Sequence, residues 1–475
     1  MMRSFATTTD LMPHQLDAAT KMLPSRVGAL FMEMGTGKSR TAIELARVRS
    51  RKFDHFVWFC PVSLKETVRQ EILKHTDCRT EDICVFDDRI NERNIPPADW
   101  YIVGIESMQS SARTVFAVNE LITERSFVAL DESTYCKNHR AKRTERITRL
   151  SERARYRLAM TGTPLTQGIV DLYAQMRFLS PKILGYQSFY SFAANHLEYS
   201  EKYPGMVVRT HNEEYLAAKI RPYVYQVTKE ECMTLPPKLY ETRCVSMTPE
   251  QREAYEYAKH RFLWEEEQYA DPFMDRVRIF RLFTALQQIV SGFWNDRGKL
   301  HEFPHDRLEQ LLHTIWMIPE HEKVIIWAKY HYDIAQIGLA LEQRYGADAV
   351  AYYYGALNEM KRNRELEKFR REARFLVATQ GTGGHGLTMN EAAYHIFYNN
   401  GFKYSERIQA EDRSHRIGQT RPPTYIDIRC VNSIDDRIHA ALDAKGDVVE
   451  RFREEVQRVR DSGMKERVKE LIMSL

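Results

Sequence analysis

Two series of short apolar runs constrain the fold of this chain more than any other feature. The first series lies at residues 27–32, 55–60, 100–105, 126–131 and 157–162. The second series lies at residues 323–328, 350–355, 374–379, 395–399 and 424–431. Helical or charged segments separate the runs, which is the pattern of buried parallel strands joined by crossover helices. The sequence therefore predicts an α/β fold with two units, each built on a parallel sheet.

The chain between the two series has a different character. From about residue 170 to 320 it is helical and aromatic, and the paired prolines of TLPPKLY force an extended connection there. The charged C-terminal stretch is helix-prone, and we expect a solvated helix, with a partner-binding tail as the alternative. The predicted segments are a first unit at 1–175, helical protrusions and a connector at 176–300, a second unit at 301–445, and a helical tail at 446–475.

Composition narrows the class of protein. A chain of 475 residues suggests two to four domains, and 43% hydrophobic with 28% charged residues is ordinary for a soluble protein. The net charge of +4 permits a nucleic-acid partner without requiring one. Seven scattered cysteines without a CxxC pair favour reduced thiols and argue against a zinc site. With no signal-peptide core and no membrane-length apolar run, we expect a cytoplasmic monomer with no membrane partner.

The stretch MEMGTGKS at residues 32–39 lies between an apolar run and the helically spaced SRTAIELARV. A strand, a glycine turn and a helix start together form an anion site, because backbone N–H groups and the helix dipole converge there. Met32 stands where the usual phosphate loop begins with glycine, so a plain glycine turn that caps a helix is the alternative. On the phosphate interpretation, Lys38 reaches the outer phosphates and Ser39 holds Mg²⁺. The other predicted nucleotide-binding residues here are Gly35, Thr36, Gly37 and Arg40.

Two later strand ends carry polar groups. Asp131 and Glu132 of DEST follow the fourth run, where Asp131 can hold Mg²⁺ and Glu132 can orient and deprotonate water. Such a pair alone is usually a cap or a solvated turn, but together with the loop it favours nucleotide hydrolysis. In LAMTGTPLTQG, the hydroxyls of Thr161 and Thr163 could sense the nucleotide, and the alternative is an ordinary turn before Pro164.

The most specific stretch of the second unit is QAEDRSHRIGQ at residues 409–419. Arg413 and Arg416 are three residues apart, which predicts one face of a helix from which both can converge on phosphates. Such arginines neutralise the charge that develops in phosphoryl transfer, and the alternative is a charged surface helix. The glycine-rich TQGTGGHGLTMNEA at 379–392 could approach phosphates or be only a flexible turn.

These motifs, in this order, resemble the Swi/Snf-like ATPases of helicase superfamily two, from residue 11 to residue 438. DESTYCKN stands for the family's Asp-Glu-Ala-His box, and DRSHRIGQ, its most diagnostic string, is intact. The remaining matches are MPHQ, MEMGTGKS, VWFCPVSLKETVRQE, LAMTGTPLTQG, and the connector strings RPYVYQVTKEECMTLPPKLYE and MTPEQREAY.

The resemblance implies two tandem RecA-like α/β lobes with helical protrusions between them, and ATP with Mg²⁺ at the cleft between the lobes. It implies that Gln15 contacts the adenine, that Gly384 and Gln409 also bind the cofactor, and that duplex DNA is held by its backbone with little sequence preference. The implied catalytic residues are Lys38, Asp131, Glu132, Arg413 and Arg416. The compact size suggests a stand-alone bacteriophage or bacterial motor.

Several positions depart from the family's pattern. They are Met32, Val68 in place of a tryptophan, Ser133 and Thr134 in place of Ala-His, and His385. None removes a catalytic residue, so we expect an active DNA-dependent ATPase that translocates on or remodels duplex DNA. The alternatives are a strand-separating DNA or RNA helicase and a nucleotide-gated DNA clamp without turnover.

Overall fold

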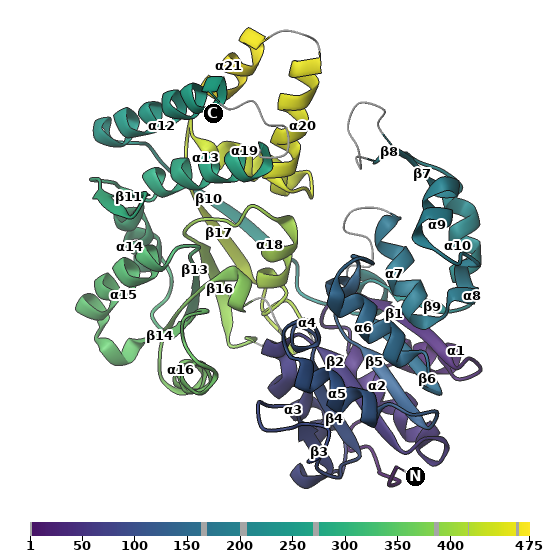
Figure 1. Ribbon diagram of the computed structural model, residues 1–475. Helices are drawn as coiled ribbons and strands as arrows, with labels where there is room; N and C mark the ends of the chain where they lie inside the picture. Colours follow the sequence, from purple (N-terminus) through teal and green to yellow (C-terminus); the bar gives the residue numbers. More distant parts are fainter. Residues whose placement is uncertain are drawn as a thin grey trace. The chain divides into compact units, whose positions relative to one another are not determined.

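The protein consists of two compact units, Met1–Thr234 and Leu235–Leu475. The computed structural model describes residues 2–162, 169–199, 207–268, 275–383, 389–416, 418–461 and 465–475. In each unit a twisted sheet carries helices on both faces (Figure 1). Every described strand pair in these two sheets is parallel, so the predicted α/β class with two parallel sheets is confirmed.

The first sheet has the strand order β3-β4-β2-β5-β6-β1-β9 among the described residues. Its strands are β1 (Val27–Met32), β2 (His55–Cys60), β3 (Ile83–Val85), β4 (Trp100–Gly104), β5 (Ser126–Leu130), β6 (Tyr156–Met160) and β9 (Val224–Val227). Five of them coincide with the first series of apolar runs. The sequence did not predict β3, which has only three residues, or β9, which lies in the segment expected to be helical.

Alternation along the central strand shows why the apolar runs are continuous. Phe56 and Trp58 of β2 face one helical layer, whereas Val57 and Phe59 face the other, and all four are fully buried. The first layer contains α1 (Pro13–Met22), α2 (Lys38–Arg49) and α3 (Lys65–His75). The second layer contains α5 (Ala112–Leu121), α6 (Lys142–Ser151) and α7 (Val170–Leu179). A strand buried on both faces needs no polar residues between its apolar ones.

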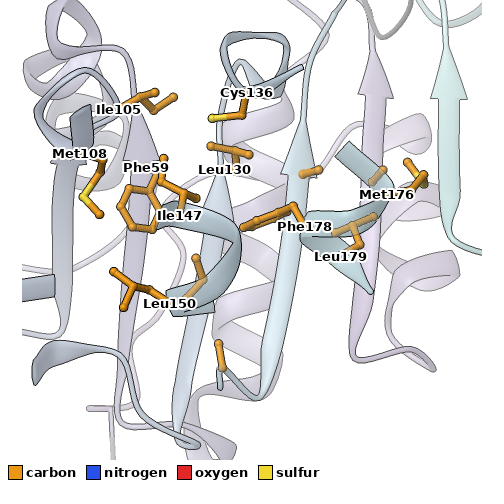
Figure 2. Close-up of a cluster of buried hydrophobic side chains, with 14 of the residues drawn as sticks. Phe59, Ile105, Met108, Leu130, Cys136, Ile147, Leu150, Met176, Phe178 and Leu179 are labelled. Carbon is orange, nitrogen blue, oxygen red and sulfur yellow. The ribbon is translucent and has the colours of Figure 1, made fainter. Parts of the chain in front are cut away.

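Figure 2 shows the second layer of this unit. Ile147 and Leu150 of α6 pack over Phe59 and Leu130 at the sheet surface, beside Phe178 of α7. Smaller elements complete the unit. They are α4 (Ser107–Ser110), α8 (Pro181–Leu184), α9 (Phe189–His196), the antiparallel pair β7 (Leu197–Tyr199) and β8 (Val207–Thr210), α10 (Glu213–Ile220) and α11 (Lys229–Cys232).

The second sheet has the order β10-β17-β16-β13-β15-β14 among the described residues. Its strands are β10 (Leu239–Val245), β13 (Lys323–Trp327), β14 (Val350–Tyr353), β15 (Phe375–Ala378), β16 (Ala392–Phe397) and β17 (Thr424–Cys430). Five of these match the second series of runs, and β10 directly follows the paired prolines. One face carries α14 (Arg307–Met317) and α15 (His331–Tyr345), and the other carries α16 (Glu359–Arg371) and α18 (Tyr404–Glu411).

A third core in the second unit is built mainly by helices. Its helices are α12 (Pro249–Gln268), α13 (Asp275–Val290), α19 (Ile434–Asp443), α20 (Val448–Asp461) and α21 (Lys465–Met473). Phe452 and Val456 of α20 and Ile472 of α21 are buried in it. The expectation of a solvated C-terminal helix is therefore wrong, because these apolar side chains are buried where α20 packs on α13 and α21 packs on α12.

The predicted segment 176–300 is divided between the units. Its first part supplies β9 to the first sheet, and its second part supplies β10 to the second sheet and a hairpin of β11 (Phe293–Asp296) and β12 (Lys299–Glu302). In the described part of the chain, no helix combines the length and the apolar character needed to cross a bilayer.

Candidate functional site

Three neighbouring strands of the first sheet end beside one another. In the order β5-β6-β1, the residues after the strands are Asp131 and Glu132, then Thr161, and then the glycine loop at 33–37. The Thr161 N–H donates to the Leu30 carbonyl over 3.1 Å, which ties the end of β6 to β1. Because parallel strands present their carboxyl ends at one edge, the predicted phosphate loop and the acidic pair lie at the same edge.

The turn after β6 packs directly on the glycine loop. A Cβ atom on Gly162 would lie 3.0 Å from Met34 Cγ and 3.1 Å from the Met34 backbone nitrogen. A side chain here would require the two segments to move apart by a few tenths of an ångström, so glycine fits this approach best. Thr163 and Pro164 of the same motif lie outside the described residues. The structure therefore brings Thr161 to the loop.

The loop itself requires glycine at two positions. Gly35 and Gly37 have φ angles of +80° and +85°, in the left-handed region that other residues rarely adopt. A Cβ atom on Gly37 would also lie 2.1 Å from Gln15 Nε2. The loop then enters α2 at Lys38, so that the first backbone N–H groups of a 12-residue helix stand at the loop.

Lys38 folds back over the loop that precedes it. Its Nζ donates to the Met32 carbonyl over 3.0 Å and to the Glu33 carbonyl over 3.4 Å. Neutral carbonyls are weaker partners for an ammonium group than anionic oxygens, so these bonds are ones that a phosphate can replace. Ser39 follows in the first turn of α2 and is half-buried. The loop, the lysine and the helix start thus have the arrangement that an anion site needs.

Gln15 contacts the loop from α1. Its Nε2 donates to the Thr36 carbonyl over 3.1 Å, and its Oε1 accepts from the Met12 N–H over 3.1 Å. His14 Nε2 lies 2.7 Å from the same Thr36 carbonyl oxygen. His14 belongs to the MPHQ motif but was not singled out from the sequence, because one histidine beside a glutamine carries no signal of its own. An adenine contact for Gln15 stays a prediction.

Arg40 is almost fully buried, with 4% of its surface exposed. Its guanidinium donates to the Thr9 hydroxyl over 3.1 Å, to the Thr9 carbonyl over 2.7 Å, and to Glu44 Oε2 over 3.1 Å. These contacts fasten the N-terminal segment to α2. The predicted nucleotide contact of Arg40 stays a prediction, and its side chain here stabilises the elements around the loop.

Asp131 is a buried carboxylate with two hydrogen-bond donors. Its Oδ2 accepts from Trp58 Nε1 over 3.3 Å, and its Oδ1 accepts from the Glu132 N–H over 3.0 Å. Burial and the Glu132 charge raise the pKa of Asp131 to about 6, while Lys38 acts in the opposite direction. A carboxyl group in this state favours a nearby cation, because a positive charge offsets the cost of ionising it. The sequence did not predict Trp58 as a site residue, because it lies within an apolar run that indicates a buried strand.

Glu132 has an unusual backbone for a residue with a side chain. Its φ angle is +46°, and it precedes a short 3₁₀ helix, Ser133–Cys136. Strained backbone of this kind clusters at functional sites, which supports a chemical role for Glu132. The departure at Ser133 also has a contact: its hydroxyl donates to Gln175 Oε1 on α7 over 2.7 Å. That bond links the acidic pair to the helix that follows the TGTP motif.

The two arginines of the second unit do not lie on a helix face, so that prediction is wrong. Helix α18 ends at Glu411, and Arg413 and Arg416 lie in the turn that follows it. The three-residue separation of the two arginines fits a helix, and the residues just before them are helical, but the helix does not extend to the arginines. Arg413 is 3% exposed, and Arg416 is half-buried with its Nε donating to the Asp412 carbonyl over 3.0 Å.

Gln409 lies on α18 and is half-buried, whereas Gly384 and His385 lie outside the described residues. Beneath the turn, Arg407 donates to Glu411 Oε1 over 2.7 Å and to the two carboxylate oxygens of Asp427 over 2.6 and 3.0 Å. Burial would raise the pKa of Asp427, but Arg407 holds it below its usual value. Arg407 anchors the end of α18 to β17, and no local pattern predicts this contact because Asp427 lies 20 residues away on another element.

The chain matches two protein families. Residues 18–292 match the SNF2-related domain, and residues 306–418 match the helicase conserved C-terminal domain. Among solved structures, the Sulfolobus solfataricus SWI2/SNF2 ATPase core in complex with dsDNA has 21% identity and a TM-score of 0.43, covering 99% of this chain and 98% of that one.

Three relatives show the range of similar proteins. A Bacillus subtilis (strain 168) protein whose name describes an ATP-dependent helicase/translocase, YwqA, is 25% identical over 67% of this chain and 34% of its own length. The Schizosaccharomyces pombe chromatin structure-remodeling complex subunit snf21 is 25% identical over 68% of this chain and 28% of its own length. The human DNA annealing helicase and endonuclease ZRANB3 is 24% identical over 86% of this chain and 38% of its own length.

The chain thus spans about a third of the length of these relatives. The SNF2-related match covers more than half of the sequence and includes the loop and the acidic pair. This protein belongs to the SNF2-related family.

Proposed function

We propose that the protein is a DNA-dependent ATPase that couples ATP hydrolysis to movement along duplex DNA. The observation that carries the proposal is the convergence of Lys38, Asp131 and Glu132 at the carboxyl ends of β1 and β5, with Thr161, the residue after β6, between them. Nucleotide hydrolysis needs a positive charge at the outer phosphates, a cation site and a water-orienting carboxylate, and the three side chains at this edge are of the types that suit these tasks.

The residues divide the chemistry between them. The first N–H groups of α2 and the Lys38 ammonium bind the phosphates, with Lys38 exchanging the Met32 and Glu33 carbonyls for phosphate oxygens. Glu132 orients the attacking water and accepts its proton. Arg413 and Arg416 neutralise the charge that develops on the transferred phosphoryl group, which makes hydrolysis depend on both units.

The donor set also fits Mg²⁺. The Ser39 hydroxyl and the Asp131 carboxylate are hard oxygen donors of the kind this ion prefers, and the raised pKa of Asp131 favours a neighbouring cation. Ser39 and Asp131 would hold the ion, which would offset the negative charge of the phosphates.

DNA is the proposed partner because two of the relatives are named for DNA annealing and chromatin remodelling. A motor that holds the backbone needs only a locally basic surface, so a net charge of +4 is compatible with it. The alternatives are a strand-separating helicase and a clamp without turnover. The helicase would release a separated single strand, whereas the clamp would bind DNA without hydrolysing ATP.

A triplex-displacement assay tests the movement, and a forked-duplex unwinding assay with the same protein is its companion. We expect the wild type to displace the triplex strand in an ATP-dependent reaction and to yield little unwound product from the fork. The Glu132→Gln variant should still bind ATP but should not displace the triplex strand. Efficient release of a long single strand from a partial duplex would promote the helicase alternative. DNA binding that responds to ATP in a protein without turnover would promote the clamp.

A further inference from the structure

The first residues of the second unit contact the segment 411–416, which carries the two arginines and is called the arginine turn here. Lys238 Nζ lies 2.9 Å from Glu411 Oε2 and 3.9 Å from Asp412 Oδ1. The Tyr240 hydroxyl donates to the same Glu411 oxygen over 2.9 Å. The Pro236 carbonyl oxygen lies 3.0 Å from Nε2 of His415. The chain just after the junction between the units therefore contacts the arginine turn at three points.

The two carboxylates in these contacts are buried, whereas the Lys238 and Tyr240 side chains that reach them are partly exposed. Glu411 and Asp412 are 2% and 1% exposed, and the side chain of Lys238 is 21% exposed. Burial would raise the pKa of Glu411, but Arg407 and Lys238 hold it below its usual value. Removing the Lys238 charge leaves the buried Glu411 with fewer partners, Arg407 and Tyr240, and weakens the hold on the backbone that leads to Arg413.

The other end of the same segment is fastened to the phosphate loop. The backbone N–H of Lys229, the first residue of α11, donates to Glu33 Oε2 over 2.8 Å. Glu33 belongs to the loop, and its carbonyl is one of the two that accept from Lys38. Residues 229–238, which join the units covalently, are thus tied to the loop at one end and to the arginine turn at the other. Pro236 and Pro237 limit the backbone freedom between these ends.

We propose that residues 229–238 couple the phosphate loop to the arginine turn, and that Lys238 is a positioning residue for Arg413 and Arg416. The inference rests on the proposed ATP hydrolysis. Lys238 acts through Glu411 and Asp412, which precede Arg413 directly in the chain, and it contacts no reacting group itself. A displacement of the loop is thereby passed to the arginines along the chain that links them.

The test is the steady-state ATPase of the full chain with duplex DNA. Lys238→Met keeps the length of the side chain and removes its charge, and we expect kcat to fall about 10- to 100-fold because the arginines lose their position. KM for ATP should stay unchanged, since the phosphate loop is intact. Lys238→Arg should restore most of the rate. Tyr240→Phe, which removes one hydrogen bond to Glu411 and little else, should give a smaller loss in kcat in the same direction.

A matched control is Lys259→Met. Lys259 is 4% exposed and lies in the helical core of the same unit. Its Nζ lies 2.8 Å from Glu256 Oε1 and donates to the Met473 carbonyl over 2.9 Å. The substitution removes the same charge from a lysine whose carboxylate partner, Glu256, is more exposed than Glu411, and this pair does not contact the arginine turn. We expect unchanged kcat, whatever the loss in thermal stability.

A double-mutant cycle separates positioning from general stabilisation. In an Arg416→Ala background, Lys238→Met should cause a smaller further fold loss of kcat than in the wild type, because one of the two arginines it positions is already absent. An equal fold loss in both backgrounds, or the same loss from Lys259→Met, would overturn the inference. If Lys238→Met kept the wild-type kcat while Arg416→Ala lost activity, the inference would be overturned and the proposed function would stand. A wild-type protein without ATP turnover would overturn the proposed function and the inference together.

Discussion

The phosphate loop of the first unit and the arginine turn of the second unit are built in opposite ways. The loop is local: its lysine bonds to carbonyls five and six residues earlier, and two left-handed glycines set its shape. The arginine turn depends on partners that lie 171 to 179 residues earlier in the chain, in the segment from Pro236 to Tyr240.

The difference lies in what holds each site in place. Backbone conformation preorganises the loop, so it is sensitive to shape and to any side chain at a glycine position. Buried charge pairs preorganise the turn, so it is sensitive to the loss of a single charge far away in sequence. The two halves of the proposed ATPase should therefore fail differently when they are mutated.

Lys38→Ala should have the largest effect. We expect ATP turnover to fall below detection, because the charge that binds the outer phosphates is gone. The melting temperature should stay close to that of the wild type, since Lys38 bonds only to carbonyls of its own loop. ATPase and thermal unfolding measured on the same preparation check both halves of this prediction. Retained turnover would mean that MEMGTGKS is only a helix-capping turn.

Arg416→Ala should have the next largest effect and a different signature. Removing an arginine that neutralises the transition state costs roughly 10³-fold in rate, so kcat should fall while the affinity for ATP changes little. Arg413→Ala should lose rate and also stability, because Arg413 is 3% exposed whereas Arg416 is half-buried. ATP titration and single-turnover kinetics distinguish the two losses. Equal losses of affinity and rate for Arg416→Ala would instead indicate a ground-state phosphate contact.

The sequence predicted the loop site better than the arginine turn, for the same physical reason. β1, the glycines, Lys38 and the acidic pair are contiguous or lie at strand ends, and apolar runs mark those ends. The supports of the arginine turn are single charged residues, Lys238 and Arg407, whose partners are remote in sequence or sit on another element. No local pattern shows which carboxylate a buried lysine will meet.

The fold shows the same limit. Long apolar strands buried on both faces were predicted to within a few residues, whereas β9 and β10 were not, since their burial is partial and polar residues interrupt them. The helix expected to carry the arginines ends at Glu411, before both of them, because capping and tertiary contacts decide where a helix stops. The C-terminal helices looked solvated because their charge is visible in sequence and their packing partner is not.

A buried carboxylate in each unit allows a comparison by pH. Burial raises the pKa of Asp333 to about 7 and that of Asp131 to about 6. The folded state then binds a proton that the unfolded state releases near pH 4, so the unfolding free energy of the second unit should fall as pH rises from about 4 to about 7, by up to about 4 kcal/mol. Asp333→Asn should remove this slope, as read by hydrogen exchange of β13 and β16.

The control for that experiment is Asp131→Asn. It should alter the pH dependence of exchange in β1 and β5 and leave β13 and β16 unchanged, because each carboxyl group is buried in its own unit. An unchanged slope in Asp333→Asn would mean that Asp333 is ionised throughout this range.

Ser133→Ala should have the smallest effect. It removes the bond to Gln175 Oε1 inside the first unit, which leaves a buried acceptor with one partner fewer and costs about 1–2 kcal/mol of stability. We expect basal ATP turnover to persist and the stimulation by DNA to weaken, since the bond joins the acidic pair to α7. ATPase rates with and without duplex DNA measure the ratio. A rise in stimulation would show that the bond restrains the motor.

The central claim is that both sites serve ATP hydrolysis driven by duplex DNA. The most direct measurement is the ATPase rate of the wild type and of Glu132→Gln with duplex, single-stranded and forked DNA and with RNA, at low and raised salt. We predict that duplex DNA stimulates the wild type at least as well as any other nucleic acid. The stimulation should fade steeply with salt as counterions compete for the phosphates, and Glu132→Gln should bind ATP without hydrolysing it. Stimulation by RNA or single strands alone, or wild-type turnover in Glu132→Gln, would contradict the account.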